Sequence, residues 1–424
     1  MKKGKIVILL CLFCLLGVSL IASAQRQVTL QFMGWEASPL ETASVKAGLA
    51  QFMKENPGIR VEYVPVAEDQ YISKLLTMMV GKAAPDVFFI YAEGHYRDFQ
   101  KRGVLLDVTD YFYETMKLED FIPIERQKMV IDGRIYGISS CVVAPILYYN
   151  KDLFDQAGIP YPPSDPEEAW TWEEFVEICQ KLTIRKGNRT EQYGIFGFEV
   201  IHPREALIAT SGGKFFNESY TKTIFDKPAQ DALQKILDLR EKYKVSPPAN
   251  FQEQSGMSGS QMLQTGRVAM VADGSWALQE LAKMDFRLGV GVLPKIKQPA
   301  TTGTSHLHAI WKETKHPEES WKLLKFLSSE EYQIQLIKEG LWMPNRTSLY
   351  TEEGMKRWLN PDVHPEGFEK IAPYFTKYLI PHPSLFINRE AWDVMVEEFE
   401  NFLFDKQPMN KVAPRLIQRV DEKL

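Results

Sequence analysis

Short apolar stretches alternate with amphipathic stretches over the first part of the sequence. Residues 28–33, 59–66 and 86–91 have the length and the β-branched and aromatic content of strands. Between them, residues 40–56 and 68–82 carry apolar side chains at the spacing of one helix face. The first of these helices is expected to stop at an Asn-Pro-Gly sequence. Alternating strands and helices predict an α/β fold with a parallel sheet and crossover helices.

Further strand patterns are spread along the rest of the chain. Residues 146–149, 268–272, 287–293 and 306–311 are predicted strands, and helical patterns separate most of them. A Thr-Trp-Glu-Glu sequence starting at Thr171 predicts a capping box at the beginning of one helix. Because strand-rich sequence returns late in the chain, we expect one lobe to be built from discontinuous pieces. A chain of 424 residues is long enough for two lobes.

The beginning of the chain has the three parts of a secretory signal peptide. Lysines at positions 2, 3 and 5 precede a nearly unbroken apolar run over residues 6–21, and a small-residue cleavage site follows at 22–24. The alternative is an uncleaved membrane anchor, which needs about 20 apolar residues, more than this run contains. We therefore expect residues 1–24 to be a cleaved signal peptide and the mature protein, starting at Gln25, to be periplasmic or extracellular.

Composition narrows the classes of function. The hydrophobic fraction of 45% and the charged fraction of 25% are those of a soluble globular protein, and the net charge of −5 disfavours a nucleic-acid partner. Cys141 and Cys179 lie outside the predicted signal peptide, and they either pair or remain separate buried thiols. Aromatic residues make up 12% of the chain and include nine tryptophans. Aromatic faces in loops suit a carbohydrate site, since sugar rings present apolar C–H faces that stack on them.

The sequence carries no catalytic signature that we can identify. It lacks an HExxH helix, a GxSxG elbow, a Walker loop and a GxGxxG after a strand. His306 and His308 alternate on a predicted strand and so share one face, but no third metal ligand lies near them in the sequence. We expect no catalytic residue, no metal and no cofactor. A secreted carbohydrate-active enzyme of the glycoside hydrolase type remains the alternative, because two suitably placed carboxylates are enough for that chemistry.

Several short motifs form an ordered set along the chain. The main ones are Ala-Pro-Asp-Val at 84–87, Tyr-Tyr-Asn-Lys-Asp-Leu-Phe at 148–154, Gly-Arg-Val-Ala-Met at 266–270 leading to Asp-Gly-Ser-Trp at 273–276, and Gly-Val-Gly-Val-Leu-Pro at 289–294. Each is weak alone, but their order and spacing cover essentially the whole chain after the predicted signal peptide. The set resembles extracellular solute-binding proteins of ABC importers, most of all the sugar-binding group that includes maltodextrin-binding proteins.

The resemblance implies a two-lobed, periplasmic-binding-protein-like α/β fold of type II. Its lobes would be discontinuous, with residues 25–143 and 287–340 in the N-terminal lobe and residues 144–286 and 341–424 in the C-terminal lobe. The implied function is capture of a sugar or oligosaccharide in the cleft between the lobes, followed by delivery to the membrane permease subunits of an ABC importer. The protein would act as a monomer.

The resemblance also implies where the hinge and the sugar contacts lie. Three hinge crossings are expected near residues 141–146, 286–290 and 340–344. The expected ligand-binding residues are Trp35 and Glu36 after the first strand, Tyr91 and Glu93 after the Pro-Asp strand, Trp276 opposite them, His306 and His308 where residues 302–306 depart from the family pattern, and Trp342. Asp86 and Asn150 belong to the motifs too, but we expect them to satisfy local backbone groups and not to bind ligand.

Overall fold

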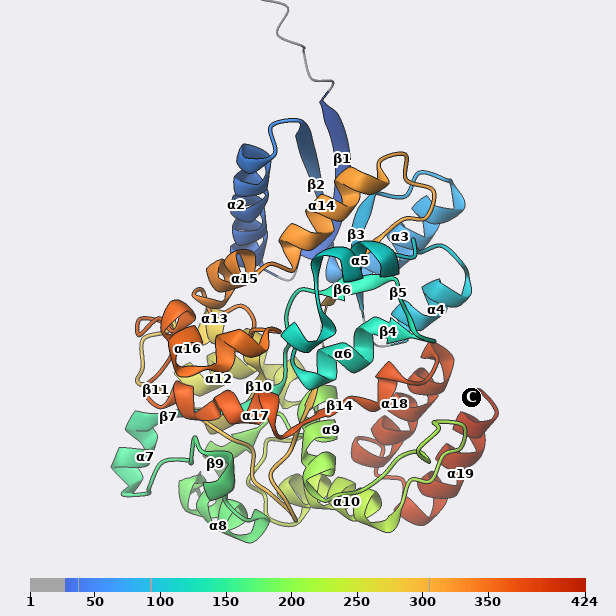
Figure 1. The fold of residues 1–424 in the computed structure, drawn as a ribbon. Coiled ribbons are helices and arrows are strands. Elements are labelled where there is room, and N and C mark those ends of the chain that lie inside the picture. The colour runs from blue at the N-terminus through green and yellow to red at the C-terminus, as the bar shows by residue number, and fades with distance from the viewer. Residues whose placement is uncertain (1–26, 37, 92–93, 305) are drawn as a thin grey trace, which may run out of the picture.

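The chain folds into two α/β lobes, and each contains a five-stranded sheet (Figure 1). The computed structural model describes residues 27–36, 38–91, 94–304 and 306–424. The predicted signal peptide, residues 1–24, lies outside the described residues. The predicted α/β class and two-lobed architecture are confirmed.

The sheet of the first lobe has the strand order β2-β1-β3-β13-β6. Its strands are β1 (Val28–Glu36), β2 (Ile59–Ala67), β3 (Val87–Tyr91), β6 (Gly137–Ser139) and β13 (His306–Ile310). β1 is parallel to β2 and β3, as the alternating pattern predicts, whereas β13 is antiparallel to both of its neighbours. β1 extends to Glu36, so Trp35 and Glu36 lie at the end of this strand and not in a following loop.

Helices pack around this first sheet (Figure 1). They are α2 (Pro39–Glu55), α3 (Glu68–Val80), α4 (His95–Lys101), α5 (Thr109–Thr115), α6 (Pro123–Met129), α14 (Pro317–Leu327) and α15 (Glu330–Ile337). Ser38 caps α2, because its Oγ accepts a hydrogen bond of 3.1 Å from the backbone N–H of Glu41. α2 ends at Glu55, just before the Asn-Pro-Gly stop signal. Because α2 begins only a few residues after β1 ends, the N-terminus of α2 lies at the carboxyl end of β1. Open α/β sheets bind ligands at this edge.

The sheet of the second lobe has the strand order β11-β7-β10-β9-β8. Its strands are β7 (Pro145–Asn150), β8 (Ile184–Lys186), β9 (Arg189–Phe196), β10 (Val268–Gly274) and β11 (Leu288–Gly291). β11 pairs antiparallel with β7, and Val290 and Leu293 are buried in the core of the second lobe. This corrects the expected lobe boundary at residue 287, since the apolar side chains that follow it fill the second core.

The helices of the second lobe include the capping box that the sequence predicts. They are α7 (Lys151–Ala157), α8 (Trp172–Leu182), α9 (Ile201–Thr210), α10 (Lys227–Glu241), α11 (Phe251–Ser255), α12 (Gly259–Gln264), α13 (Leu278–Leu281), α16 (Glu352–Trp358), α17 (Ala372–Thr376), α18 (Arg389–Leu403) and α19 (Met409–Asp421). Thr171 and Glu174 form a reciprocal capping box at the start of α8, as expected. A short 3₁₀ helix, η3 (Ser275–Ala277), joins β10 to α13.

Three segments of the chain run side by side between the lobes. Val142 exchanges two backbone hydrogen bonds of 3.0 Å with Met343, and Val143 is paired in the same way with Thr304. Successive side chains point to opposite cores, as strand geometry requires. Val143 and Trp342 pack in the core of the first lobe, whereas Val142 and Met343 pack in that of the second.

Two of these crossings lie within the predicted ranges 141–146 and 340–344. The remaining crossing is at Thr304 and not near 286–290, because β11 still belongs to the second sheet. Just before this crossing, β12 (Thr301–Gly303) pairs with β14 (Leu379–Pro381), and after it the chain enters the first lobe through β13.

The two cysteines and the motif residues Asp86 and Asn150 have structural roles in the fold. Cys141 and Cys179 are separate, buried thiols, which is the second of the two alternatives. Asp86 accepts hydrogen bonds from the Gln31 backbone and the Thr314 hydroxyl, at 2.9 and 2.6 Å, and Asn150 caps α7. Both motif residues thus have the local structural roles that we expected. Among the described residues, no helix has the length and apolar character needed to cross a bilayer.

Candidate functional site

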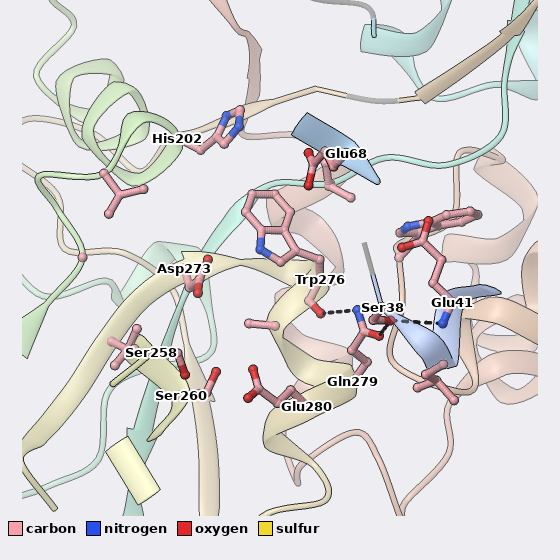
Figure 2. A pocket seen from close by; sticks show the side chains of 18 of the residues that line it. Ser38, Glu41, Glu68, His202, Ser258, Ser260, Asp273, Trp276, Gln279 and Glu280 are labelled. Carbon is pink, nitrogen blue, oxygen red and sulfur yellow. Dashed lines mark hydrogen bonds between the residues drawn. The ribbon is translucent and has the colours of Figure 1, made fainter. Parts of the chain in front are cut away.

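A cavity of about 870 Å³ lies between the two lobes, and side chains from both lobes line it (Figure 2). The first lobe contributes the carboxyl ends of β1 and β3 and the first turns of α2 and α3. The second lobe contributes the end of β10, η3 and the start of α12. Five of the expected contact residues line the cavity, namely Trp35, Tyr91, Trp276, His306 and Trp342.

Stacked aromatic rings form the wall on the side of the first lobe. Trp35 lies parallel to Tyr91, with ring centroids 4.2 Å apart and an interplanar angle of 8°. His306 contacts the Trp35 indole with a centroid distance of 4.2 Å. The ring centroids of His306 and Trp342 are 5.4 Å apart. Trp35 and Trp342 are only 2% and 3% exposed, whereas Tyr91 is half-buried. Tyr91 is therefore the more accessible ring of this wall, and Trp35 supports it from behind.

Trp276 is the principal aromatic side chain on the opposite wall. It lies in η3, directly after β10, and its half-buried indole projects into the cavity in Figure 2. The ring rests on Gly274, since a Cβ atom at this glycine would lie 2.2 Å from atoms of the indole. His202 contacts the indole edge-on at a centroid distance of 5.4 Å. Trp276 packs against the cores of both lobes, which places it where they meet.

Carboxyl groups face the cavity from both lobes. Burial, with a contribution from Glu68, raises the pKa of Glu41 to about 8. Burial also raises the pKa of Asp273 to about 6, although hydrogen bonds from the Gly274 backbone and the Trp276 side chain oppose that shift. Glu68 accepts a 2.7 Å hydrogen bond from the Tyr91 hydroxyl, and Glu280 is exposed to the solvent. A carboxyl group of this kind suits sugar hydroxyls, because its oxygens accept the hydrogen bonds that hydroxyls donate.

The two histidines of β13 have different surroundings. His306 lines the cavity, and burial together with nearby Lys128 lowers its pKa to about 3, so its ring is neutral at physiological pH. His308 shares the same face of the strand but does not line the cavity. Its ring is fully buried against Phe89, with centroids 4.4 Å apart. The expectation that His308 contacts a ligand is therefore not supported by its position.

Two acidic residues from the expected set also lie elsewhere. Glu36 is not among the cavity-lining residues, and its carboxylate accepts a 3.1 Å hydrogen bond from the hydroxyl of Thr42. Glu93 lies outside the described residues. In the described part of the chain, no group of three or more His, Cys, Asp or Glu side chains is placed to hold a metal ion.

Several polar residues of the site were not predicted from the sequence. Ser38 and Gln279 meet across the cavity, where the Ser38 hydroxyl donates a 2.7 Å hydrogen bond to Oε1 of Gln279 (Figure 2). Nε2 of Gln279 in turn donates to the backbone carbonyl of Trp276 at 3.1 Å. The Ser-Pro pair before α2 and the glutamate three residues after the serine were a readable capping signal. They mark a helix start next to Trp35, and hence the position of Ser38 and Glu41 at the cavity.

Comparison with known proteins defines the class to which this fold and cavity belong. The family model described as "Bacterial extracellular solute-binding protein" matches residues 37–334. The chain belongs to this family. The resemblance predicted from the motifs is thereby confirmed, and the carbohydrate-active enzyme that the sequence left open finds no support.

Individual relatives agree with this assignment. A putative binding protein of Brucella abortus (strain 2308) is 23% identical over 299 residues, which are 69% of this chain and 70% of the relative. An ABC substrate-binding protein from Listeria monocytogenes in complex with cycloalternan has a TM-score of 0.81 at 23% identity and covers 93% of this chain and 98% of its own. Maltose-bound MalE3 of T. maritima has a TM-score of 0.75 at 22% identity, covering 94% and 100% of the two chains. These structures share the fold of this chain.

Proposed function

We propose that this protein captures a sugar or oligosaccharide in the interlobe cavity and presents it to the membrane permease of an ABC importer. It acts as an exported monomer, released from its signal peptide outside the cytoplasmic membrane. It binds its ligand without turning it over.

The Trp276 indole is the observation that carries this proposal. It is half-buried, lies on a glycine, and faces a cavity that both lobes line. An aromatic face of this kind supplies most of the apolar contact in a pocket, and a few polar groups then set orientation. Related structures with bound cycloalternan and bound maltose support a saccharide ligand.

The other contacts divide between the two walls. Tyr91 offers a second, smaller aromatic surface, with Trp35 behind it, and His306 and Trp342 close the cavity toward the crossings. Glu41, Glu68 and Asp273 provide acceptors for hydroxyl groups, and Glu41 also donates while it is protonated. A ligand that touches both walls stabilises the closed arrangement, because it binds that arrangement more tightly than an open one.

A thermal-shift screen followed by calorimetry tests the proposal. The purified mature chain is mixed with maltose, maltotriose, mannotriose, lactose and an arabinooligosaccharide. A ligand at 100 times its Kd adds about 2.7 kcal/mol of stability, which is readily detected as a rise in Tm. We expect one-to-one binding, a smaller radius of gyration in small-angle scattering, and recovery of the unaltered sugar. Hydrolysis of the sugar, or no shift with any saccharide, would contradict the proposal.

A further inference from the structure

The cavity contains many acidic groups and few basic ones. Glu41 and Glu68 face it from the first lobe, and Asp273 and Glu280 face it from the second (Figure 2). Lys283 is the one lysine or arginine among the described residues that line it. Two histidines, His202 and His306, also line the cavity, and the imidazole of His306 adds no positive charge because burial keeps it neutral. A ligand that enters this cavity therefore meets a negative potential from both walls.

Glu41 is the member of this group that indicates a ligand. The residue is 3% exposed, and its Oε1 has no hydrogen-bond partner among the described residues. Leaving a buried polar atom without a partner costs free energy, so such an atom needs an explanation. A hydroxyl group of a bound saccharide would provide the missing partner. A hydroxyl group both donates and accepts, so it can pair with Glu41 whether that carboxyl group is ionised or protonated, whereas an anionic oxygen can pair only with the protonated form.

The helix starts at the cavity do not offset this negative charge. The N-terminus of a helix attracts anions through its free N–H groups. At α2, however, the Ser38 Oγ accepts the hydrogen bond of the Glu41 N–H, at 3.1 Å. At α12, Ser258 Oγ accepts that of the Gln261 N–H in the same way, at 3.2 Å. A serine side chain therefore already occupies one donor at each of these two helix starts, whereas α3 has no capping side chain and instead carries Glu68 and Asp69 in its first turn.

We infer that the ligand is a saccharide without carboxylate, phosphate or sulfate groups, and that Glu41 and Glu68 are the residues that exclude acidic sugars. This inference rests on the proposed function and specifies its substrate class. The two glutamates act in two ways. They form hydrogen bonds with hydroxyl groups of a neutral sugar, and they repel an acidic group at the same position, Glu41 doing so once the pH exceeds its pKa of about 8.

Pairs of trisaccharides that differ only at C6 test the inference by calorimetry. β-1,4-Mannotriose is compared with the β-1,4-linked trimer of mannuronate, α-1,4-galactotriose with trigalacturonate, and maltotriose with its C6-oxidised counterpart. We expect at least one neutral trimer to bind and its acidic partner to bind at least about tenfold more weakly above pH 8, where the buried Glu41 is ionised and adds its repulsion to that of the exposed Glu68. An acidic trimer that binds as tightly as its neutral partner would overturn the inference but leave the proposed function intact. If no trimer binds, the saccharide that raises Tm in the screen is compared with its carboxylate-bearing counterpart; only the failure of every saccharide in the screen would overturn both.

Variants then assign the selectivity to the two glutamates. In the double variant Glu41→Gln with Glu68→Gln, we expect the ratio of acidic to neutral Kd to fall about tenfold or more, through the loss of like-charge repulsion. Glu55→Gln is the control, because Glu55 is exposed at the opposite end of α2. If the double variant weakens both sugars equally, the glutamates only maintain the cavity and the assignment is wrong. Thermal unfolding of each variant without sugar verifies that it is folded.

Discussion

Replacement of Trp276 by alanine tests the site most directly. The indole is half-buried, rests on Gly274 and contacts His202 at its edge, so the substitution removes the surface that faces the cavity together with some packing against these neighbours. Loss of an aromatic residue that dominates a binding site costs about 2 kcal/mol or more. That free energy corresponds to a rise in Kd of about 30-fold. We expect this rise for the tightest-binding saccharide of the screen, measured by calorimetry.

The stability of the unliganded variant separates a binding role from a packing role. Truncation of a fully buried tryptophan costs about 3–5 kcal/mol of folding free energy. Trp358→Ala is the matched comparison, because Trp358 is completely buried and its Nε1 donates a 2.8 Å hydrogen bond to the Leu349 carbonyl. We expect Trp358→Ala to lower Tm strongly and leave the Kd of the folded protein unchanged. If Trp276→Ala shows that same behaviour, Trp276 is a packing residue and the reasoning is refuted.

Three further substitutions probe the cavity. Gly274→Ala places a methyl group 2.2 Å from the indole of Trp276, so we expect the ring to shift. Overpacking costs about 1–3 kcal/mol, so we expect Kd to rise about tenfold. An unchanged Kd would show that binding does not depend on the position of the ring over Gly274. Ser38→Ala removes both the cap of α2 and the hydrogen bond to Gln279. We expect the free energy of unfolding to fall by more than the ~1 kcal/mol that loss of a cap alone costs. Ser329→Ala, which removes the cap of α15, is its control, and equal losses would argue against a stabilising contact between the lobes. Burial raises the pKa of Glu41 from 4.5 to about 8, so the folded protein keeps a proton that the unfolded chain loses, and stability should fall as the pH rises through that interval. Glu41→Gln should flatten this part of the pH dependence in urea unfolding, and an unaltered slope would contradict the assigned pKa.

Features that depend on local sequence were predicted well. The strand at 28–33, the stop of α2 and the capping box of α8 arise from side chains within a few residues of each other. β11 shows where local patterns fail. Its apolar sequence identifies a strand, but the choice between the two sheets depends on which core its side chains fill, and the pairing with β7 spans more than a hundred positions. The second crossing was therefore placed too early.

The histidines of β13 show the same limit within a single strand. Alternation correctly puts His306 and His308 on one face. The alternation does not show how deeply each of the two side chains is buried. Two residues along a strand span about 6.6 Å, which is enough to move a side chain from the edge of the cavity into the core. His306 therefore lines the cavity, whereas His308 is enclosed by Phe89 and Phe32.

Ser38 shows how a residue with a local role also takes part in the site. Its hydroxyl oxygen accepts from the α2 backbone and its proton goes to Gln279 of the other lobe, which holds the carbonyl of Trp276. One serine thus connects the helix that carries Glu41 to the turn that carries the stacking indole. Because a single hydrogen bond contributes only about 0.5–1.5 kcal/mol net, this connection cannot hold the lobes together alone. A ligand that touches both walls would add to this connection, so the affinity should depend on Trp276 and Glu41 together and not on either wall alone.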